Sequence, residues 1–82
     1  MELTIKLFSK VKEYHDNGNI KFEGEYLNGK RHGKGKEYYY YNGLLKYEGE
    51  YFEGKRNGYG KEYYYNGKLI FEGKFVNGEK KK

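Results

Sequence analysis

The chain has 82 residues and a formal charge of +5, from 17 Lys and Arg against 12 Asp and Glu. Only 35% of residues are hydrophobic, and most of these are aromatic, with 12 Tyr and 5 Phe. Apolar burial must therefore come from aromatic rings, and a thick two-layer core is not expected. Cysteine is absent, which excludes disulfides and thiolate metal sites.

The first segment, residues 1–11, alternates apolar and polar side chains, with Leu3, Ile5 and Leu7 on one side. This period of two predicts a strand that caps the rest of the chain. The segment lacks the continuous apolar block of a secretory signal, and no run approaches the roughly 20 apolar residues of a spanning helix. We therefore expect a cytoplasmic protein, with attachment to a membrane surface left open.

A tandem repeat fills the remainder of the chain. Segments 12–35, 36–60 and 61–82 align with one another, and their starts differ by 24 (36 − 12) and 25 (61 − 36) residues. The third unit is partial and ends in lysines. Repeats of this length are typical of elongated arrays in which each unit packs only on its neighbours.

In each unit an Asn-Gly pair separates two strand-like segments, which is a strong hairpin signal. The pairs are Asn17-Gly18, Asn42-Gly43 and Asn66-Gly67. Two-residue loops at the first and third pairs set opposite charges across the hairpin, a favourable cross-strand contact. The pairs expected from these loops are Lys12 with Glu23, Lys61 with Glu72, Gly60 with Gly73, Tyr63 with Ile70 and Tyr65 with Lys68.

The middle unit has one more tyrosine than the others, and a two-residue loop there would set Glu37 against Glu48. A three-residue loop, 41–43, with its glycine in the left-handed region, restores Lys36 opposite Glu48 and Glu37 opposite Tyr47. We therefore predict a longer loop in the middle hairpin.

The segments LNGKRHGKG and FEGKRNGYG between hairpins are interpreted as longer turns. Within the strands, alternation groups aromatic rings with a column of glycine on one face, where a ring can lie across a glycine. This face comprises Phe22, Gly24, Tyr26, Tyr47, Gly49, Tyr51, Leu69, Phe71, Gly73 and Phe75, and the further structural glycines are Gly33, Gly35, Gly58 and Gly60. The predicted fold is all-β, an elongated single-layer antiparallel meander of successive β-hairpins.

The pattern Y/F-x-G-x-Y/F-x-x-G-x-x-x-G-x-G, present in FEGEYLNGKRHGKG and YEGEYFEGKRNGYG, resembles the MORN repeat. The resemblance covers about residues 12 to 78. It implies a sheet of successive hairpins with no catalytic activity of its own, involved in protein contacts, dimerisation or attachment near membranes. Bacterial relatives with similar spacing suggest an antitoxin-like binder. The chain departs from the pattern where Glu53 replaces the Asn of a turn pair and where the third copy lacks the final G-x-G.

Basic residues recur at equivalent places and are candidates for binding phosphate or anionic lipid along one edge of the sheet. These are Lys30, Arg31, Lys34, Lys55 and Arg56. Nearby glutamates neutralise part of this positive charge, and charged turn tips also protect a sheet against edge association.

Tyrosines are the candidates for protein contact, because a tyrosine ring offers a large area at little entropic cost. The candidate residues are Tyr26, Tyr39, Tyr40, Tyr51, Tyr64 and Phe75. Nucleic-acid stacking is disfavoured, since consecutive tyrosines in a strand point to both faces.

No catalytic, cofactor or metal site is predicted. His15 and His32 have no second ligand at matching spacing, and neither a nucleophile constellation nor a nucleotide-binding glycine loop is present. The leading hypothesis is a non-enzymatic interaction or scaffold module with a protein partner or self-association and no small-molecule substrate. The alternatives are attachment to anionic lipid and antitoxin-like binding.

Overall fold

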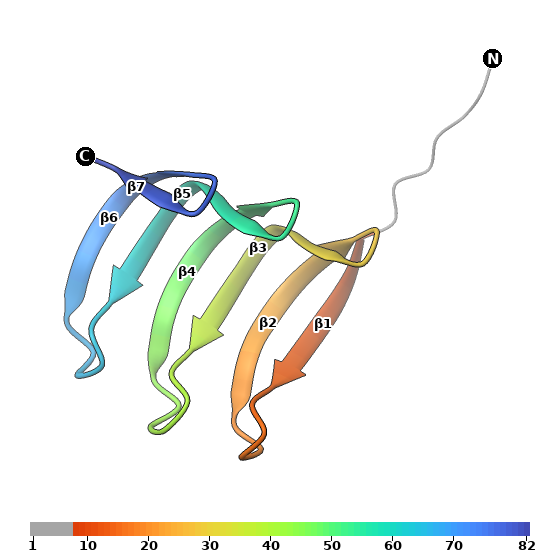
Figure 1. The fold of residues 1–82 in the computed structure, drawn as a ribbon, viewed down its shortest axis with the longest axis vertical. Coiled ribbons are helices and arrows are strands. Elements are labelled where there is room, and N and C mark those ends of the chain that lie inside the picture. The colour runs from red at the N-terminus through yellow and green to blue at the C-terminus, as the bar shows by residue number, and fades with distance from the viewer. Residues whose placement is uncertain (1–7) are drawn as a thin grey trace.

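The computed structural model describes residues 8–82, which form one antiparallel sheet without a helix (Figure 1). The strands are β1 (Phe8–Tyr14), β2 (Ile20–Leu27), β3 (Lys30–Tyr38), β4 (Leu45–Phe52), β5 (Lys55–Tyr63), β6 (Leu69–Val76) and β7 (Glu79–Lys81). Each strand pairs with the next in sequence, which confirms the predicted all-β meander. The capping strand expected over residues 1–11 falls only partly within the described residues, which begin at Phe8. Leu3, Ile5 and Leu7 lie outside them.

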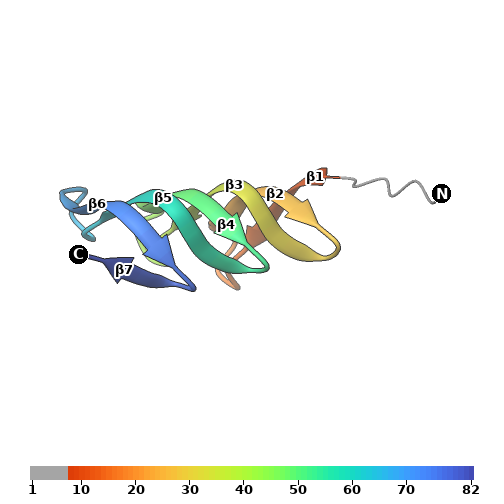
Figure 2. The ribbon, with the colours of Figure 1, turned by 90° about the horizontal axis from the view of Figure 1, so that it is seen from above.

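The sheet is a single layer, 13 Å along its shortest axis. Its strands curve along their length when seen from above (Figure 2). The loops that hold Asn17-Gly18, Asn42-Gly43 and Asn66-Gly67 lie at one end of the strands, and the turns that connect successive hairpins lie at the other end (Figure 1). The two ends therefore carry different kinds of loop.

The Asn-Gly hairpins have loops one residue longer than the two-residue loops predicted for the first and third units. In the first, Gly18 N–H donates to the His15 carbonyl at 3.0 Å, and His15 N–H donates to the Asn19 carbonyl at 2.8 Å. Residues 16–18 thus form a three-residue loop. Gly18 takes a φ of 90°, as a type I turn followed by a left-handed residue requires.

The third hairpin repeats this loop, with Tyr64 instead of Tyr65 bonded to Lys68, and with Tyr63 opposite Leu69 instead of Ile70. These two predicted pairs are therefore wrong. A bulge at Ile70 absorbs the additional residue, so the charge pair Lys61–Glu72 keeps its predicted register. The bulge also takes Leu69 out of the alternation, and this side chain is 49% exposed rather than part of the aromatic face.

The middle hairpin has the longest loop, as predicted, although it spans residues 40–43 and not 41–43. Tyr39 N–H donates to the Leu44 carbonyl at 2.9 Å, and Gly43 lies in the left-handed region at a φ of 69°. Lys36 faces Glu48, as the charge argument required. Every Asn-Gly loop is thus one residue longer than predicted, and a bulge preserves the predicted charge register.

The segments interpreted as longer turns are instead tight two-residue turns followed by strands. The turns are Asn28-Gly29, Glu53-Gly54 and Asn77-Gly78, and all six residues have positive φ, between 51° and 88°. Two successive positive φ values define the type I′ turn, whose twist matches that of the flanking strands. The two-residue loops expected at Asn17-Gly18 and Asn66-Gly67 therefore occur instead at the opposite end of the sheet.

The core consists of aromatic rings that lie across glycines. Phe22 and Tyr47 are both fully buried, and they contact the buried rings of Tyr51 and Phe75 edge-on at centroid distances of 5.2 to 5.4 Å. A Cβ added at Gly60 would lie 2.6 Å from Cε1 of the Tyr47 ring. The predicted shielding of glycine by rings is confirmed, because each ring packs against backbone where the glycine has no side chain.

We predict that Gly60→Ala destabilises the fold by about 1–3 kcal/mol, because the new methyl group overlaps the Tyr47 ring. Urea denaturation followed by circular dichroism measures the loss. In a double-mutant cycle, Tyr47→Leu removes the ring, and Gly60→Ala should then cost clearly less. An equal cost in both backgrounds would contradict the ring contact as the cause.

Candidate binding surfaces

Two arginines fold over the aromatic face and close it. Arg31 binds the Glu13 carboxylate with Nε and Nη2, at 2.9 and 3.0 Å, and its guanidinium lies 4.2 Å from the centroid of Phe22. Arg56 binds Glu37 in the same bidentate way, at 2.9 and 3.3 Å, and lies 4.3 Å from the centroid of Tyr47. Each buried ring is thus held between a glycine backbone and a paired guanidinium. We call each such unit of carboxylate, cation and ring a clamp.

A third clamp is made by Lys80 on β7 and Glu62 on β5. Lys80 Nζ lies 2.5 Å from Glu62 Oε1 and 5.9 Å from the centroid of Phe71. Arg56 Nη1 also reaches Glu62, at 3.1 Å, so the second and third clamps are joined. A lysine cannot form the planar bidentate fork of arginine, which leaves this clamp with the weaker geometry.

Tyrosine hydroxyls complete the first two clamps. Tyr26 donates to Glu13 at 2.5 Å, and Tyr51 donates to Glu37 at 2.5 Å. Phe75 occupies the equivalent place in the third clamp and has no hydroxyl. Glu62 Oε1 is buried there without a well-aligned donor among the described residues. The clamps therefore weaken toward β7.

The clamps shift the pKa values of their members. Hydrogen bonds from Arg31 lower the pKa of Glu13 below its ordinary value. Burial alone would raise the pKa of Glu37, but hydrogen bonds from Arg56 and Tyr51 outweigh it and lower that pKa. Burial raises the pKa of Tyr47 to about 12 and raises that of Tyr51 further. The carboxylates therefore stay ionised and the tyrosines stay neutral over the physiological range.

The predicted strip of five cations does not exist as a continuous site. Arg31 and Arg56 are bound to carboxylates on the aromatic face, with side chains 19% and 16% exposed. Lys30 forms an exposed ion pair with Glu53 at 3.7 Å. Lys34 lines the opposite face of the sheet, and Lys55 is exposed at the connecting turn. Arg31 lies two residues before Gly33 and four before Gly35, so the period of two of a strand places Arg31 on the same face as Gly35. This placement was not predicted because the segment was interpreted as a turn.

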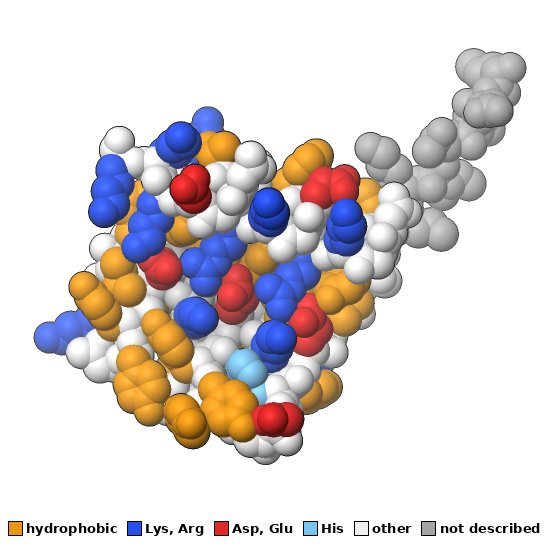
Figure 3. All heavy atoms as spheres, in the orientation of Figure 1, with side chains coloured by type: hydrophobic (Ala, Val, Ile, Leu, Met, Phe, Trp, Pro, Cys, Tyr) orange, Lys and Arg blue, Asp and Glu red, His pale blue; other side chains and the backbone are white. Residues whose placement is uncertain are grey.

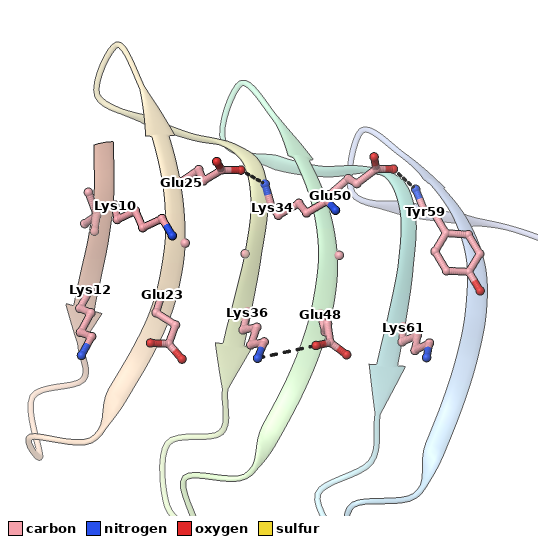
Figure 4. A pocket seen from close by; sticks show the side chains of 14 residues that line it. Lys10, Lys12, Glu23, Glu25, Lys34, Lys36, Glu48, Glu50, Tyr59 and Lys61 are labelled. Carbon is pink, nitrogen blue, oxygen red and sulfur yellow. Dashed lines mark hydrogen bonds and ion pairs between the residues drawn. The ribbon is translucent and has the colours of Figure 1, made fainter. Parts of the chain in front are cut away.

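The opposite face of the sheet holds an open groove of about 990 Å³ that crosses β1 to β5 (Figure 4). Its floor is backbone at the glycine column, and five lysines and four glutamates line it. Along one side the charges alternate from strand to strand, and Lys36 contacts Glu48 at 3.8 Å. The alternation nearly neutralises the groove, so the chain's net charge of +5 is not concentrated there.

The strands that cross the groove are kinked at Gly33 and Gly58, where φ is 95° and 102°. Carboxylates bind the backbone beside each kink: Glu25 accepts from Lys34 N–H at 2.8 Å, and Glu50 accepts from Tyr59 N–H at 2.6 Å. These glutamates therefore have structural partners, in addition to lining the groove (Figure 4).

The Asn-Gly end of the sheet carries exposed rings, which form a row of hydrophobic side chains along the lower border of the face in Figure 3. We call the exposed tyrosines of this end the tyrosine edge; they are Tyr14, Tyr40, Tyr41, Tyr64 and Tyr65, which are 37% to 79% exposed. Asparagines link its loops, since Asn17 donates to the Tyr40 carbonyl at 2.8 Å and Asn42 donates to the Tyr65 carbonyl at 2.9 Å. The rings are thus presented on ordered loops.

The candidate contact residues divide between this edge and the interior. Tyr40 and Tyr64 belong to the tyrosine edge. Tyr39 is partly buried and donates to the Tyr63 carbonyl at 2.6 Å. Tyr26 is bound to its clamp, as described above. Tyr51 and Phe75 are 4% and 1% exposed, so burial removes them from the partner surface.

The sequence prediction missed Tyr14, Tyr41 and Tyr65. Tyr41 is 79% exposed and Tyr65 is 54% exposed. Both stand directly before an Asn-Gly pair, and that position in a loop was the signal that could have found them.

The two histidines have structural contacts. His15 Nε2 lies 3.1 Å from the Tyr38 carbonyl, and the His32 ring packs between Phe8 and Phe52 at centroid distances of 5.9 and 5.0 Å. No group of three metal-ligating side chains occurs within residues 8–82. A helix able to cross a membrane is likewise not found in this part of the chain.

Comparison with known proteins gives one result. The sequence profile of the MORN repeat matches residues 22–44 and 47–68, which together make up more than half of the chain. Comparisons with curated proteins and with solved structures found no match. The two matched segments begin at Phe22 and Tyr47, the rings that the first two clamps cover.

We predict that acid weakens the fold through the clamps. The pKa of Glu37 is below its ordinary value of 4.5 in the folded protein, so the unfolded chain binds more protons in the window between the two values. The stabilisation from this carboxylate is present above that window and is lost as pH falls through it. Urea denaturation from neutral pH down to about pH 3 should show this decline in the free energy of unfolding.

The matched variants are Glu37→Gln, inside a clamp, and Glu79→Gln, outside the carboxylate positions of the clamps. Glu37→Gln should be less stable at neutral pH and should lose less stability on acidification than the native chain. Glu79→Gln should follow the native curve. A native pH dependence in Glu37→Gln would show that the clamp carboxylate does not produce the decline.

Proposed function

Because this chain belongs to the MORN repeat family, whose modules are commonly non-catalytic interaction or scaffold elements, we propose that it binds a protein partner through its tyrosine edge. The observation that supports the proposal is the exposure of Tyr41, Tyr64 and Tyr65, at 79%, 53% and 54%. A group of exposed tyrosine rings on ordered loops is typical of a contact surface.

The other faces support this choice. On the aromatic face the arginines and glutamates are already paired with one another in the clamps. In the groove the alternating lysines and glutamates neutralise one another. The tyrosine edge, in contrast, combines apolar area with hydroxyl groups on ordered loops, and tyrosine loses little conformational freedom on binding. The antitoxin-like binder suggested by the resemblance is a special case of this proposal, in which the partner is a toxin protein.

We predict that Tyr64→Ser abolishes or strongly weakens capture of a protein partner from host lysate, measured by mass spectrometry of the retained proteins. The matched control is Tyr59→Ser, because Tyr59 is 52% exposed but lies in the groove on the other face. The proposal requires a protein that is retained by the native chain and by Tyr59→Ser and lost with Tyr64→Ser. Loss with Tyr59→Ser alone would assign binding to the groove, and retention by all three would contradict a role for the edge.

Attachment to anionic lipid is the alternative that the sequence left open. The basic residues that would bind the lipid lie on different surfaces. Arg31 and Arg56 are paired with carboxylates on the aromatic face, while Lys55 is exposed at a connecting turn. We therefore expect no sedimentation with mixed phosphatidylserine–phosphatidylcholine vesicles at physiological ionic strength, and at most weak, salt-sensitive binding at low ionic strength. Strong binding that Lys30→Glu and Lys55→Glu remove would favour lipid as the ligand.

A further inference from the structure

The three strands β2, β4 and β6 occupy equivalent places in the repeat, and the first two are each covered by a following strand with the same three residues. Strand β3 covers β2: Gly35 faces Gly24, Lys36 faces Glu23, and Glu37 faces Phe22. Against β4, the same positions face Gly60, Lys61 and Glu62. The covering strand thus presents Gly-Lys-Glu in one fixed register.

The equivalent edge of β6 is unpaired along more than half of its length within residues 8–82. Within the described residues, β7 pairs only with residues 74–76 of β6, and nothing pairs with that side of 69–73. Phe22 and Tyr47 are fully buried, whereas Phe71, at the same place in the third unit, is only partly buried. Beside it, Leu69 and Ile70 are 49% and 36% exposed. This segment therefore combines unpaired backbone groups with uncovered apolar surface, the conditions under which a strand can be added to a sheet.

We propose that the outer edge of β6 at residues 69–73 binds an extended strand of a protein partner that carries Gly-Lys-Glu, set against Gly73, Glu72 and Phe71 respectively. The site is separate from the tyrosine edge and does not depend on it.

Each of the three partner residues has a reason in the covered strands. The glycine is needed because the Phe71 ring crosses toward the added strand, as the Phe22 ring does toward Gly35, where a Cβ would lie 2.5 Å from ring atom Cε1. The lysine pairs with Glu72, as Lys61 does from the other side. The glutamate reaches the cation of the clamp, as Glu62 reaches Arg56 at 3.1 Å, and here that cation is Lys80.

The loop beyond β5 adds a fourth contact. Asn17 and Asn42 each donate to a carbonyl of the following hairpin, that of Tyr40 and that of Tyr65. Tyr40 is the fifth residue after Gly35, and Tyr65 is the fifth residue after Gly60. Asn66 is the equivalent side chain, so its amide would donate to the fifth residue after the partner's glycine.

A second copy of this chain does not meet these requirements. Its first described strand, β1, has Lys12 and Glu13 in the correct places, but Val11 stands where Gly35 and Gly60 stand in the covering strands. A valine there would place its side chain in the Phe71 ring. Val11 therefore prevents copies from stacking head to tail through this edge, which is a known way in which proteins protect open strands.

The test uses a peptide that copies residues 34–40, KGKEYYY, acetylated and amidated, titrated into the native chain and followed by the backbone amide signals of residues 69–73. We expect saturable shifts at this edge. The same peptide with Gly35→Val should bind at least about fivefold more weakly, because overpacking costs at least about 1 kcal/mol and 1.4 kcal/mol is tenfold in affinity.

A charge exchange tests the register. Glu72→Lys should weaken binding of the native peptide and should bind the peptide with Lys36→Glu better than the native chain does. Tyr41→Ser should bind the native peptide as the native chain does, so the outcome is independent of the tyrosine edge. Equal binding of the glycine and valine peptides, shifts on β1 instead of β6, or no saturable shift would each overturn the proposal.

Discussion

The packing of an aromatic ring across a glycine is the contact on which the rest of this structure depends. A one-layer sheet has no second layer to bury its side chains against, so the backbone itself must serve as one wall of the core. At Gly60 the missing side chain lets the Tyr47 ring lie against the strand, and Arg56 covers its other side. The ring is thereby fully buried in a sheet only 13 Å thick. Glycine normally weakens a strand, and here the ring replaces what its side chain would have supplied.

Much of this architecture could be derived from the sequence because the repeat supplied several independent constraints at once. Strand order, the glycine column and the cross-strand charge pairs all follow from aligning the units, and the pair Lys36–Glu48 required a longer middle loop. Loop lengths were each short by one residue because a bulge in the partner strand, such as that at Ile70, leaves the charge register unchanged. Charge pairing alone therefore cannot distinguish a short loop from a longer loop with a bulge.

The functional surfaces were harder to derive, since they depend on where long side chains lie. Arg31 was taken as a surface cation of a turn, but it belongs to a strand and reaches back to Glu13. The assignment of Tyr51 as a contact residue failed for a related reason. Tyrosines of this chain divide mainly between the core and the hairpin loops, with Tyr59 exposed in the groove, and position relative to the glycine column or the hairpin loops separates them. Composition indicated an aromatic binding protein, and the repeat geometry gathers five of the exposed tyrosines at one end of the sheet.

The clamps also determine how stability is distributed along the chain. The first two join strands of successive hairpins, since Glu13 lies on β1 and Arg31 on β3, while Glu37 lies on β3 and Arg56 on β5. The clamps therefore hold successive hairpins together, as in a one-dimensional chain of coupled elements. A single hairpin taken from this protein would lose its clamp partners and its fold. The weak Lys80 clamp makes the β7 end the place where cooperative unfolding begins, so amide exchange should be fastest there and should slow toward the middle of the sheet.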